Sequence, residues 1–340
     1  MDRNEFAKLL YGIEIPGKLS YDECSLRYQP LINYLNAFFP KTLYRYRNCE
    51  ERNIDAFYRD QIWASNGECM NDGFDARIFF DRSSVEKEIE EGLSEDSLNK
   101  ILSFMKAENA PFSGIISQFD ESELYKSLVQ FKETIRYDIS NLLNDVVSVA
   151  QSSFKFVCFS ESIVSAAMWG LYSGNESGFA LAYNFNKFSW GINDPNNIQE
   201  TFSLFPVVYA NERFKIKNNY IHFLVQRALA HRTKAPRALI EQSFPCPDNF
   251  MTSKIALSKS SEWSYEKEWR IIYTKNDSAF QNSKNACFEL SPSAIYLGRR
   301  ISYINERILI DIAREKGIQI YKMKLNDELP TYDLIPIQIK

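Results

Sequence analysis

The chain has 340 residues, of which 45% are hydrophobic and 25% charged, a composition typical of a globular protein with a large core. Its net charge of −4 predicts no broad affinity for nucleic acid, and no run of about 18 apolar residues predicts a membrane span. Six cysteines lie singly, without a C-x-x-C pair, and the charged N-terminus is unlike a secretory signal. We therefore expect a cytoplasmic protein with reduced thiols and no membrane partner.

The first 80 residues combine helical and strand patterns. The expected elements are a helix over 21–38, a strand over 42–47, a short helix near 53–60, a strand over 61–65 and a turn over 71–75. Because the side chains of a strand alternate between its faces, the strand over 42–47 presents Arg45 and Arg47 on the same face.

Residues 84–150 differ from the chain on either side. They begin acidic and rich in serine and continue with an amphipathic pattern, which is interrupted at 111–114. This predicts two or three helices inserted between strands of the main fold. We expect the insertion to contribute no strand, to pack beside a cleft and to select a partner or acceptor.

The second half of the chain is richer in strand patterns. Strands are expected over 154–160, 179–183, 206–209, 294–298, 318–324 and 332–338, helices near 168–172 and over 218–232, 251–260 and 304–316, and a loop over 234–250. Because the strands do not alternate regularly with helices, the predicted class is α+β. We expect one elaborated domain over 1–340, with a mixed, split β-sheet core around a cleft and the helical insertion at 84–150.

Residues 263–273 carry the most informative pattern. Read as a strand, they place Glu266, Glu268 and Arg270 on one face and mainly aromatic or β-branched residues on the other. Such a polar face is costly unless it lines a cleft. The alternative is a helix, in which Glu266 and Arg270 form an i,i+4 ion pair. The strand is the favoured interpretation.

Common nucleotide-binding and hydrolase motifs are absent from the sequence. It contains no G-x-x-x-x-G-K-[ST], no G-x-G-x-x-G between a strand and a helix, and no G-x-S-x-G. Its two histidines, His222 and His231, lie in a helical pattern with no neighbouring nucleophile. They are interpreted as structural or surface residues, so neither a zinc site nor a nucleophile system based on histidine is expected.

Several short motifs follow one another along the chain. They are LYRY at 43–46, NDxFD at 71–75, CFSE at 158–161, MWxxY at 168–172, GF at 178–179, Lys259, WxxExEWR at 263–270 and IYLG at 295–298. This ordered set resembles a widespread bacterial family of unknown function, over roughly residues 40–340, and WxxExEWR is its most specific part. Gly73 departs from the family pattern, which has a proline there, and this leaves the geometry of that turn open.

Three positions also resemble the Arg–Ser–Glu arrangement of ADP-ribosyltransferases. Arg45 lies on an early strand, Ser160 ends a middle strand and Glu268 ends a Glu-x-Glu element. The resemblance implies transfer of ADP-ribose from NAD, or hydrolysis of NAD. Although more than 100 residues separate each of the three from the next, we expect their strands to be neighbours around one cleft.

The resemblance gives the carboxylates and the serine catalytic roles. Glu268 would stabilise the positive charge that develops on the ribose while it binds a ribose hydroxyl. Ser160 would donate to the nicotinamide ribose or hold Glu268 in place. Glu266, two residues earlier, would orient the acceptor.

It also gives four residues binding roles towards NAD. Arg45, with Arg47 beside it, would hold the pyrophosphate through charge-assisted hydrogen bonds. Trp169 and Tyr172 would stack on a ring of the ligand.

Each of these roles has a structural alternative. Arg45 would pair with Glu266 or Glu268, and Ser160 would cap the helix that follows it. Trp169 would belong to the core. The acidic and amide residues of the NDxFD motif (Asn71, Asp72 and Asp75) are interpreted mainly as turn formers, with a metal site as the alternative.

Three functions therefore follow from the sequence. The first is a cytoplasmic NAD-dependent ADP-ribosyltransferase or NAD glycohydrolase, acting as a toxin or anti-phage effector on a protein or nucleic-acid acceptor and controlled by an inhibitory partner protein. The second is a metal-dependent nuclease or phosphodiesterase that uses the four acidic residues Asp72, Asp75, Glu266 and Glu268, although Lys267 directly follows Glu266 and the usual E-x-K order is missing. The third is a non-catalytic sensing or adaptor module with a small-ligand pocket.

Overall fold

The structure is a computed structural model in which residues 2–96, 99, 103, 120–152, 154–187, 189–193, 199–232, 245–275, 279–280, 283–328 and 330–339 are described. The α-helices are α1 (Arg3–Gly12), α2 (Tyr21–Phe38), α3 (Glu51–Tyr58), α4 (Arg82–Gly92), α7 (Glu121–Ser152), α8 (Ala166–Tyr172), α9 (Asn218–Arg232), α11 (Met251–Ala256) and α13 (Tyr303–Glu315), and the 3-10 helices are η1 (Gly67–Cys69) and η2 (Ser261–Glu266). None of the helices in this described part of the chain combines the length and the apolar character that a membrane span requires.

The strands fall into one large sheet and one small one. The strands are β1 (Thr42–Arg47), β2 (Gln61–Ser65), β3 (Lys155–Ser160), β4 (Phe179–Asn184), β5 (Ser189–Asn193), β6 (Gln199–Pro206), β7 (Val208–Ala210), β8 (Ser258–Ser260), β9 (Glu268–Lys275), β10 (Asn285–Glu289), β11 (Ala294–Leu297), β12 (Gln319–Leu325) and β13 (Leu334–Ile339). The large sheet has the order β13-β12-β11-β4-β1-β3-β9-β6-β5, with β2 and β10 branching from β3, and β7 pairs with β8 in the small one. Parallel and antiparallel pairs are both present, so the α+β class with a mixed, split sheet is confirmed.

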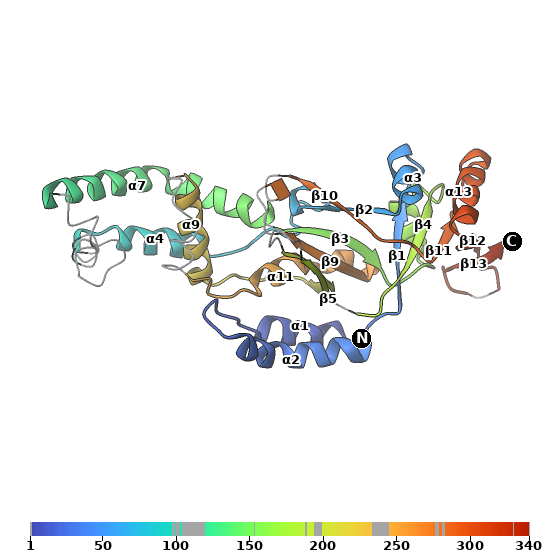
Figure 1. Ribbon diagram of the computed structural model, residues 1–340, viewed down its shortest axis with the longest axis horizontal. Helices are drawn as coiled ribbons and strands as arrows, with labels where there is room; N and C mark the ends of the chain where they lie inside the picture. Colours follow the sequence, from blue (N-terminus) through green and yellow to red (C-terminus); the bar gives the residue numbers. More distant parts are fainter. Residues whose placement is uncertain are drawn as a thin grey trace.

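The sheet forks at β3, and this fork decides where the site lies. On one side β3 pairs continuously with β9, whereas on the other side it meets two different strands (Figure 1). Ser160, at the end of β3, pairs with Tyr44 of β1, and Phe156, near its start, pairs with Ser65 of β2. The strands β1 and β2 therefore diverge, and α3 connects them. The expected adjacency of the strands that carry Arg45, Ser160 and Glu268 is confirmed.

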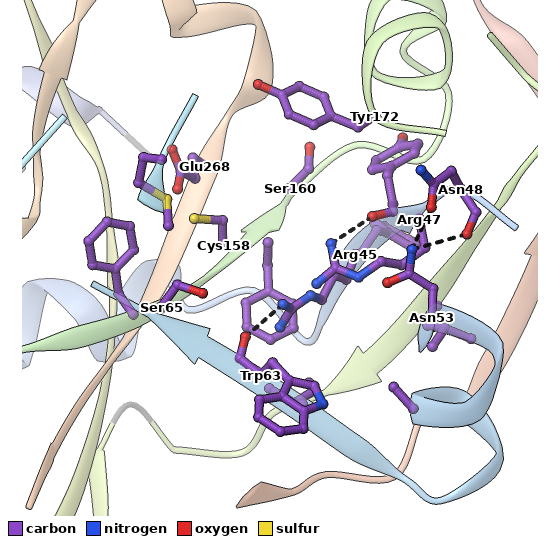
Figure 2. Close-up of a pocket in the computed structure, with 18 of the residues that line it drawn as sticks. Arg45, Arg47, Asn48, Asn53, Trp63, Ser65, Cys158, Ser160, Tyr172 and Glu268 are labelled. Atoms are coloured by element: carbon purple, nitrogen blue, oxygen red, sulfur yellow. Dashed lines mark hydrogen bonds between the residues drawn. The ribbon is translucent and has the colours of Figure 1, made fainter. Parts of the chain in front are cut away.

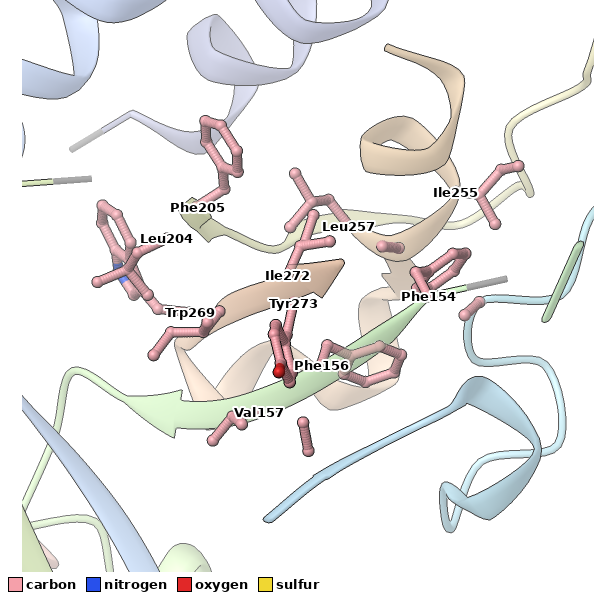
Figure 3. Packing of buried hydrophobic residues seen from close by; sticks show 14 of the residues in the cluster. Phe154, Phe156, Val157, Leu204, Phe205, Ile255, Leu257, Trp269, Ile272 and Tyr273 are labelled. Carbon is pink, nitrogen blue, oxygen red and sulfur yellow. The ribbon is translucent and has the colours of Figure 1, made fainter. Parts of the chain in front are cut away.

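Alternation along β3 and β9 separates a core face from a polar face. Val157, Trp269 and Tyr273 are almost fully buried in the main core, where they pack with residues of β6 and α11 (Figure 3). On the opposite face Ser160 pairs in register with Glu268, and Cys158 with Arg270. The apolar and aromatic residues from Trp269 onward thus drive strand formation by burying one side of β9.

The strand expected over 263–273 begins only at Glu268. Residues 261–266 form the 3-10 helix η2, and Lys267 adopts a left-handed conformation, with φ 46° and ψ 49°. The prediction that Glu266 and Glu268 share one face of a continuous strand is therefore wrong. The helix alternative is wrong as well, because Arg270 lies on β9 and pairs with Glu268 and Asp75.

The described residues of the 84–150 segment are almost all helical and contribute no strand. Most of α7, together with α4 and α9, lies at the end of the molecule opposite to β11–β13 (Figure 1). None of these described residues lines the cavity between β1 and β2, and the role of the segment in acceptor selection stays a prediction.

Candidate functional site

A cavity of about 710 Å³ opens in the fork between β1 and β2 (Figure 2). Its walls come from β1, α3 and β2 on one side, and from β3, the start of β9, η2, α8 and β8 on the other. This volume is in the range of small-molecule sites. Six residues singled out in the sequence line it together: Arg45, Arg47, Ser160, Tyr172, Glu266 and Glu268. The roles proposed for them stay predictions.

Two arginines of β1 line the cavity, and neither has a counter-ion among the residues that the structure describes. Arg45 is only 9% exposed, and its Nη2 atom donates to the carbonyl oxygen of Trp63 at 2.9 Å, so that its side chain spans the fork (Figure 2). Its Nη1 atom is buried and has no hydrogen-bond partner among the described residues. Arg47 donates to the carbonyl oxygen of Tyr46 at 3.1 Å. Neither guanidinium forms an ion pair within the described part of the chain, so the structural pairing suggested for Arg45 is wrong.

Burial of these two cations has an electrostatic consequence. Desolvation lowers the pKa of Arg45, and desolvation together with Arg45 lowers the pKa of Arg47. Both shifts indicate that the positive charges are poorly compensated. A bound anion would supply the missing charge and accept from the unpartnered Nη1 atom of Arg45.

A buried cluster of charges forms the opposite wall. The Nζ atom of Lys259 lies 2.5 Å from Glu266 Oε2 and 2.9 Å from Glu268 Oε2. Arg270 binds both oxygens of Asp75 at 2.7 Å, and its Nε atom donates to Glu268 Oε1 at 2.7 Å. All five side chains are at most 8% exposed. Three carboxylates meet two cations, which leaves an excess of one negative charge beside the cavity.

The two glutamates of the cluster differ in acidity. Burial raises the pKa of Glu266, and Lys259 only partly offsets this. Burial would also raise the pKa of Glu268, but Arg270 and Lys259 together lower it below its ordinary value. Neighbouring carboxyl groups whose pKa values move apart are typical of an acid–base residue beside a permanently charged one. Glu266 has the properties of the former, and Glu268 those of the latter.

Ser160 and Tyr172 both hold Glu266. Ser160 Oγ donates to the carbonyl oxygen of Glu266 at 2.6 Å and accepts from the Ser162 amide at 3.2 Å. The hydroxyl of Tyr172 donates to Glu266 Oε1 and accepts from Asn71 Nδ2 at 3.1 Å. Ser160 therefore does not cap the helix that follows, since Ser165 caps α8. Tyr172 presents its hydroxyl rather than its ring face to the cluster.

Local backbone geometry brings the two glutamates together. The left-handed Lys267 turns the chain between them, and its carbonyl oxygen accepts from the Glu161 amide at 3.2 Å. A non-glycine residue in this region is strained and needs such support. Close packing also shapes the β1 wall, because a Cβ atom on Gly178 would lie 2.1 Å from the carbonyl oxygen of Arg47.

Trp169 is not part of the site, and its predicted stacking role is wrong. Its side chain is 0% exposed, its Nε1 atom donates to the carbonyl oxygen of Ile163 at 2.7 Å, and it does not line the cavity. It packs edge-on against Tyr46 in a core cluster beneath α8. A fully buried indole with its one donor already satisfied has no free surface for a ligand.

Sequence reasoning missed part of the site. Asp75 was expected to shape a turn, but it is buried and binds Arg270. Asp72 does form the turn, since its carboxylate accepts from the Phe74 amide at 2.9 Å. Asn48 and Asn53 also line the cavity, where Asn53 donates to Asn48 (Figure 2). No local sequence pattern indicates the ion pair of Asp75 with Arg270, because the two residues are 195 positions apart.

The carboxylate cluster does not resemble a metal centre. Among the described residues, no group of three or more His, Cys, Asp or Glu side chains has the geometry to hold a metal ion. The three carboxylates point at Lys259 Nζ and at the guanidinium of Arg270, so side-chain cations occupy the position that a metal ion would take. Cys158 is not a candidate nucleophile, since burial and then Glu268 raise the pKa of its thiol.

Comparison with known proteins gives one match. Residues 168–271 match a family described as "Protein of unknown function (DUF2971)". The resemblance to a family of unknown function is thus confirmed for this segment, which contains Tyr172, Lys259 and the WxxExEWR element. No curated protein and no solved structure matches the chain. The DUF2971 description assigns no activity, so a function can be inferred only from the residues of the cavity.

Proposed function

We propose that the protein cleaves the bond between nicotinamide and ribose in NAD and passes ADP-ribose to water or to an acceptor. The observation that carries the proposal is that one cavity brings together the Glu266–Glu268 pair and two arginines, Arg45 and Arg47, that form no ion pair in the described part of the chain. A ligand that spans this cavity needs an anionic part near β1 and a part that gains positive charge near η2. NAD has a pyrophosphate for the first and a nicotinamide ribose for the second.

The chemistry assigns a distinct task to each carboxylate. The C–N bond breaks with its electron pair moving to the pyridinium nitrogen, and this leaves neutral nicotinamide and positive charge at ribose C1′. Glu268, held ionised by Arg270 and Lys259, stabilises that charge. An oxygen nucleophile then forms the new bond to C1′, and Glu266 accepts its proton. Because the pKa of Glu266 is raised, this carboxylate is the stronger base of the two.

One further feature agrees with the wider proposal. All six cysteines are free, which supports a reducing compartment such as the cytoplasm. The acceptor is proposed to be a protein or a nucleic acid, and control by an inhibitory partner protein would suit an NAD-consuming toxin or anti-phage effector. The nuclease hypothesis has weaker support, because Lys259 and Arg270 neutralise most of the carboxylate charge that a metal site would need.

Product analysis tests the proposal. Purified protein is incubated with NAD in EDTA and, separately, in magnesium, and nicotinamide and ADP-ribose are quantified. We expect equal nicotinamide release in both buffers. In Glu266→Gln, transfer to an added acceptor should fall more than hydrolysis, since Glu266 is proposed to orient the acceptor as well as to accept its proton. Nucleic-acid cleavage that needs magnesium, without nicotinamide release, would support the nuclease instead, and ligand binding without turnover would support the adaptor.

A further inference from the structure

Arg3, the first residue of α1, binds the backbone of the strand that carries Glu268. Its Nη1 atom donates to the carbonyl oxygen of Glu268 at 2.9 Å and to that of Val207 at 2.6 Å. Its Nη2 atom forms an ion pair with Glu161 Oε1 at 2.8 Å. One guanidinium therefore connects three segments, which are the end of β3, the start of β9 and the junction between β6 and β7.

The peptide groups of Glu268 are held from both sides. Its amide donates to the hydroxyl of Tyr209 at 2.8 Å, while its carbonyl oxygen accepts from Arg3 and from the Val207 amide at 2.9 Å. The guanidinium of Arg3 also lies 5.4 Å from the centre of the Tyr209 ring. Arg3 and Tyr209 thus form a clamp on the backbone of the residue proposed to stabilise the reacting ribose.

Glu161 connects this clamp to the end of β3, the strand that carries Ser160. It directly follows Ser160, and its amide donates to the carbonyl oxygen of Lys267 at 3.2 Å. Its Oε1 atom accepts from both Arg3 and the indole Nε1 of Trp269, the latter at 2.5 Å. The left-handed turn that separates the two glutamates is consequently tied to Arg3 through Glu161.

The helix that begins at Arg3 makes a second contact near the cluster. The hydroxyl of Tyr11 lies 2.8 Å from Ser258 Oγ, and Ser258 precedes Lys259, the cation that joins Glu266 to Glu268. The helix is well anchored, since Phe6 and Leu10 are both 0% exposed. It lies outside the segment that matches the DUF2971 family.

We propose that Arg3 is a positioning residue for Glu268 and that α1 is a working part of the site. The proposal rests on the proposed cleavage of NAD, because positioning matters only if Glu268 acts on a ligand. Arg3 does not reach the cavity itself. It fixes the start of β9, so that the carboxylate of Glu268 keeps its distance from Lys259 and from the bound ribose. Small displacements of such a group are costly for the rate, on the order of 10²-fold per ångström.

Three variants test this proposal by steady-state nicotinamide release. In Arg3→Gln, kcat should fall about tenfold to a hundredfold while KM for NAD changes less than about twofold, since the phosphate-binding wall is untouched. Arg3→Lys keeps the ion pair with Glu161 and should recover part of the loss. The matched control is Arg27→Gln, because Arg27 Nη1 also donates to a backbone oxygen of the N-terminal region, that of Glu14 at 2.7 Å. The control should keep the wild-type kcat.

Amide hydrogen exchange gives a readout that does not depend on turnover. In Arg3→Gln, the peptides that contain Val207 and Glu268 should exchange faster than in the wild type, and those of β4 should not. Unchanged exchange at these two positions would overturn the proposal whatever the activity. Faster exchange with unchanged kcat would overturn it too, because the clamp would then be purely structural. If the wild type releases no nicotinamide, the proposed function fails, and exchange alone decides whether Arg3 holds the start of β9.

Discussion

Two glutamates only two residues apart have opposite environments in this protein. Glu268 receives hydrogen bonds from Arg270 and Lys259, whereas Glu266 shares Lys259 and receives the hydroxyl of Tyr172. The cluster contains one more carboxylate than cations, so the neutralisation of one carboxylate leaves it electrically balanced. This balance decides how substitutions at Glu268 affect stability.

Glu268→Gln is expected to destabilise the protein by about 1–3 kcal/mol, less than the roughly 3–5 kcal/mol typical of breaking a buried ion pair. Glutamine keeps an acceptor for Arg270 and leaves two carboxylates for two cations. Urea unfolding measures the free energy of unfolding of the wild type and the variant. Asp248→Asn is the control, because it breaks a buried ion pair outside the cluster, in which Asp248 lies 2.8 Å from Lys254. If Glu268→Gln lowered the free energy of unfolding as much as Glu268→Ala does, charge balance in the cluster would not be what limits the loss.

Tyr172→Phe should shift the pH dependence of turnover. The hydroxyl of Tyr172 stabilises ionised Glu266, so its removal raises further a pKa that burial has already raised. Because Glu266 is proposed to act as a base in its ionised form, the acidic limb of the pH–rate profile should move to higher pH. Profiles of kcat for both proteins provide the measurement. An unmoved limb, or a shift to lower pH, would show that Glu266 is not the titrating base.

At the scale of elements, the fork of β1 and β2 from β3 creates the site. On one edge of β3, Phe156 pairs with β2 and Ser160 pairs with β1, and the two partner strands diverge between these points. The side chain of Arg45 crosses this gap and donates a hydrogen bond to the carbonyl oxygen of Trp63. One donor of this guanidinium stays unpartnered among the described residues. The fork therefore creates the proposed anion site, which a continuous sheet would not have.

Ligand-induced stabilisation tests this anion site. ADP should raise the melting temperature of the wild type, because its phosphates pair with Arg45 and Arg47, while adenosine should have little effect. In Arg45→Gln the shift with ADP should largely disappear. Arg136→Gln is a suitable control, since Arg136 pairs with the exposed Glu133 on α7 and neither residue lines the cavity. Equal shifts with ADP and adenosine would contradict phosphate recognition.

Some elements were predictable from local pattern and others were not. The helix over 21–38 and the strand β3 follow from local pattern, because the helix buries Leu31 and Leu35 on one face and β3 is a short run of mostly apolar strand-forming residues. The start of β9 at Glu268 was not predicted, since the turn at Lys267 depends on long-range support from Glu161. The strands β5, β6 and β10 were not anticipated, as they gain stability from partners distant in sequence.

At the scale of the whole molecule, the candidate site joins parts of the chain that no local pattern connects. Arg45, Ser160 and Glu268 were singled out from their strands, and the order of the sheet brings them together. The contributions of Arg3 and Asp75 depend on tertiary contacts alone. Sequence therefore indicated which residue types could act, and the packing of the molecule decided which of them meet.

The acid stability of the whole molecule should depend on Glu268. Its pKa is lowered in the folded state from an ordinary value of 4.5. A lowered pKa stabilises the fold at pH above the unfolded value, and this contribution is lost as pH falls through the folded value. The free energy of unfolding of the wild type should thus decrease below about pH 4.5 more steeply than that of Glu268→Gln. Parallel curves from denaturant titrations at each pH would contradict this.

The most direct test of the account is nicotinamide release from NAD by the wild type and by Glu268→Gln, at a temperature where both are fully folded. We predict release by the wild type and a loss of about 10²–10³-fold in the variant, since it lacks the charge that stabilises the cationic ribose. Asp248→Asn, which lowers stability at a buried pair outside the cavity, should release nicotinamide at the wild-type rate. Equal turnover by folded wild type and Glu268→Gln, or no release by the wild type with any acceptor, would contradict the account.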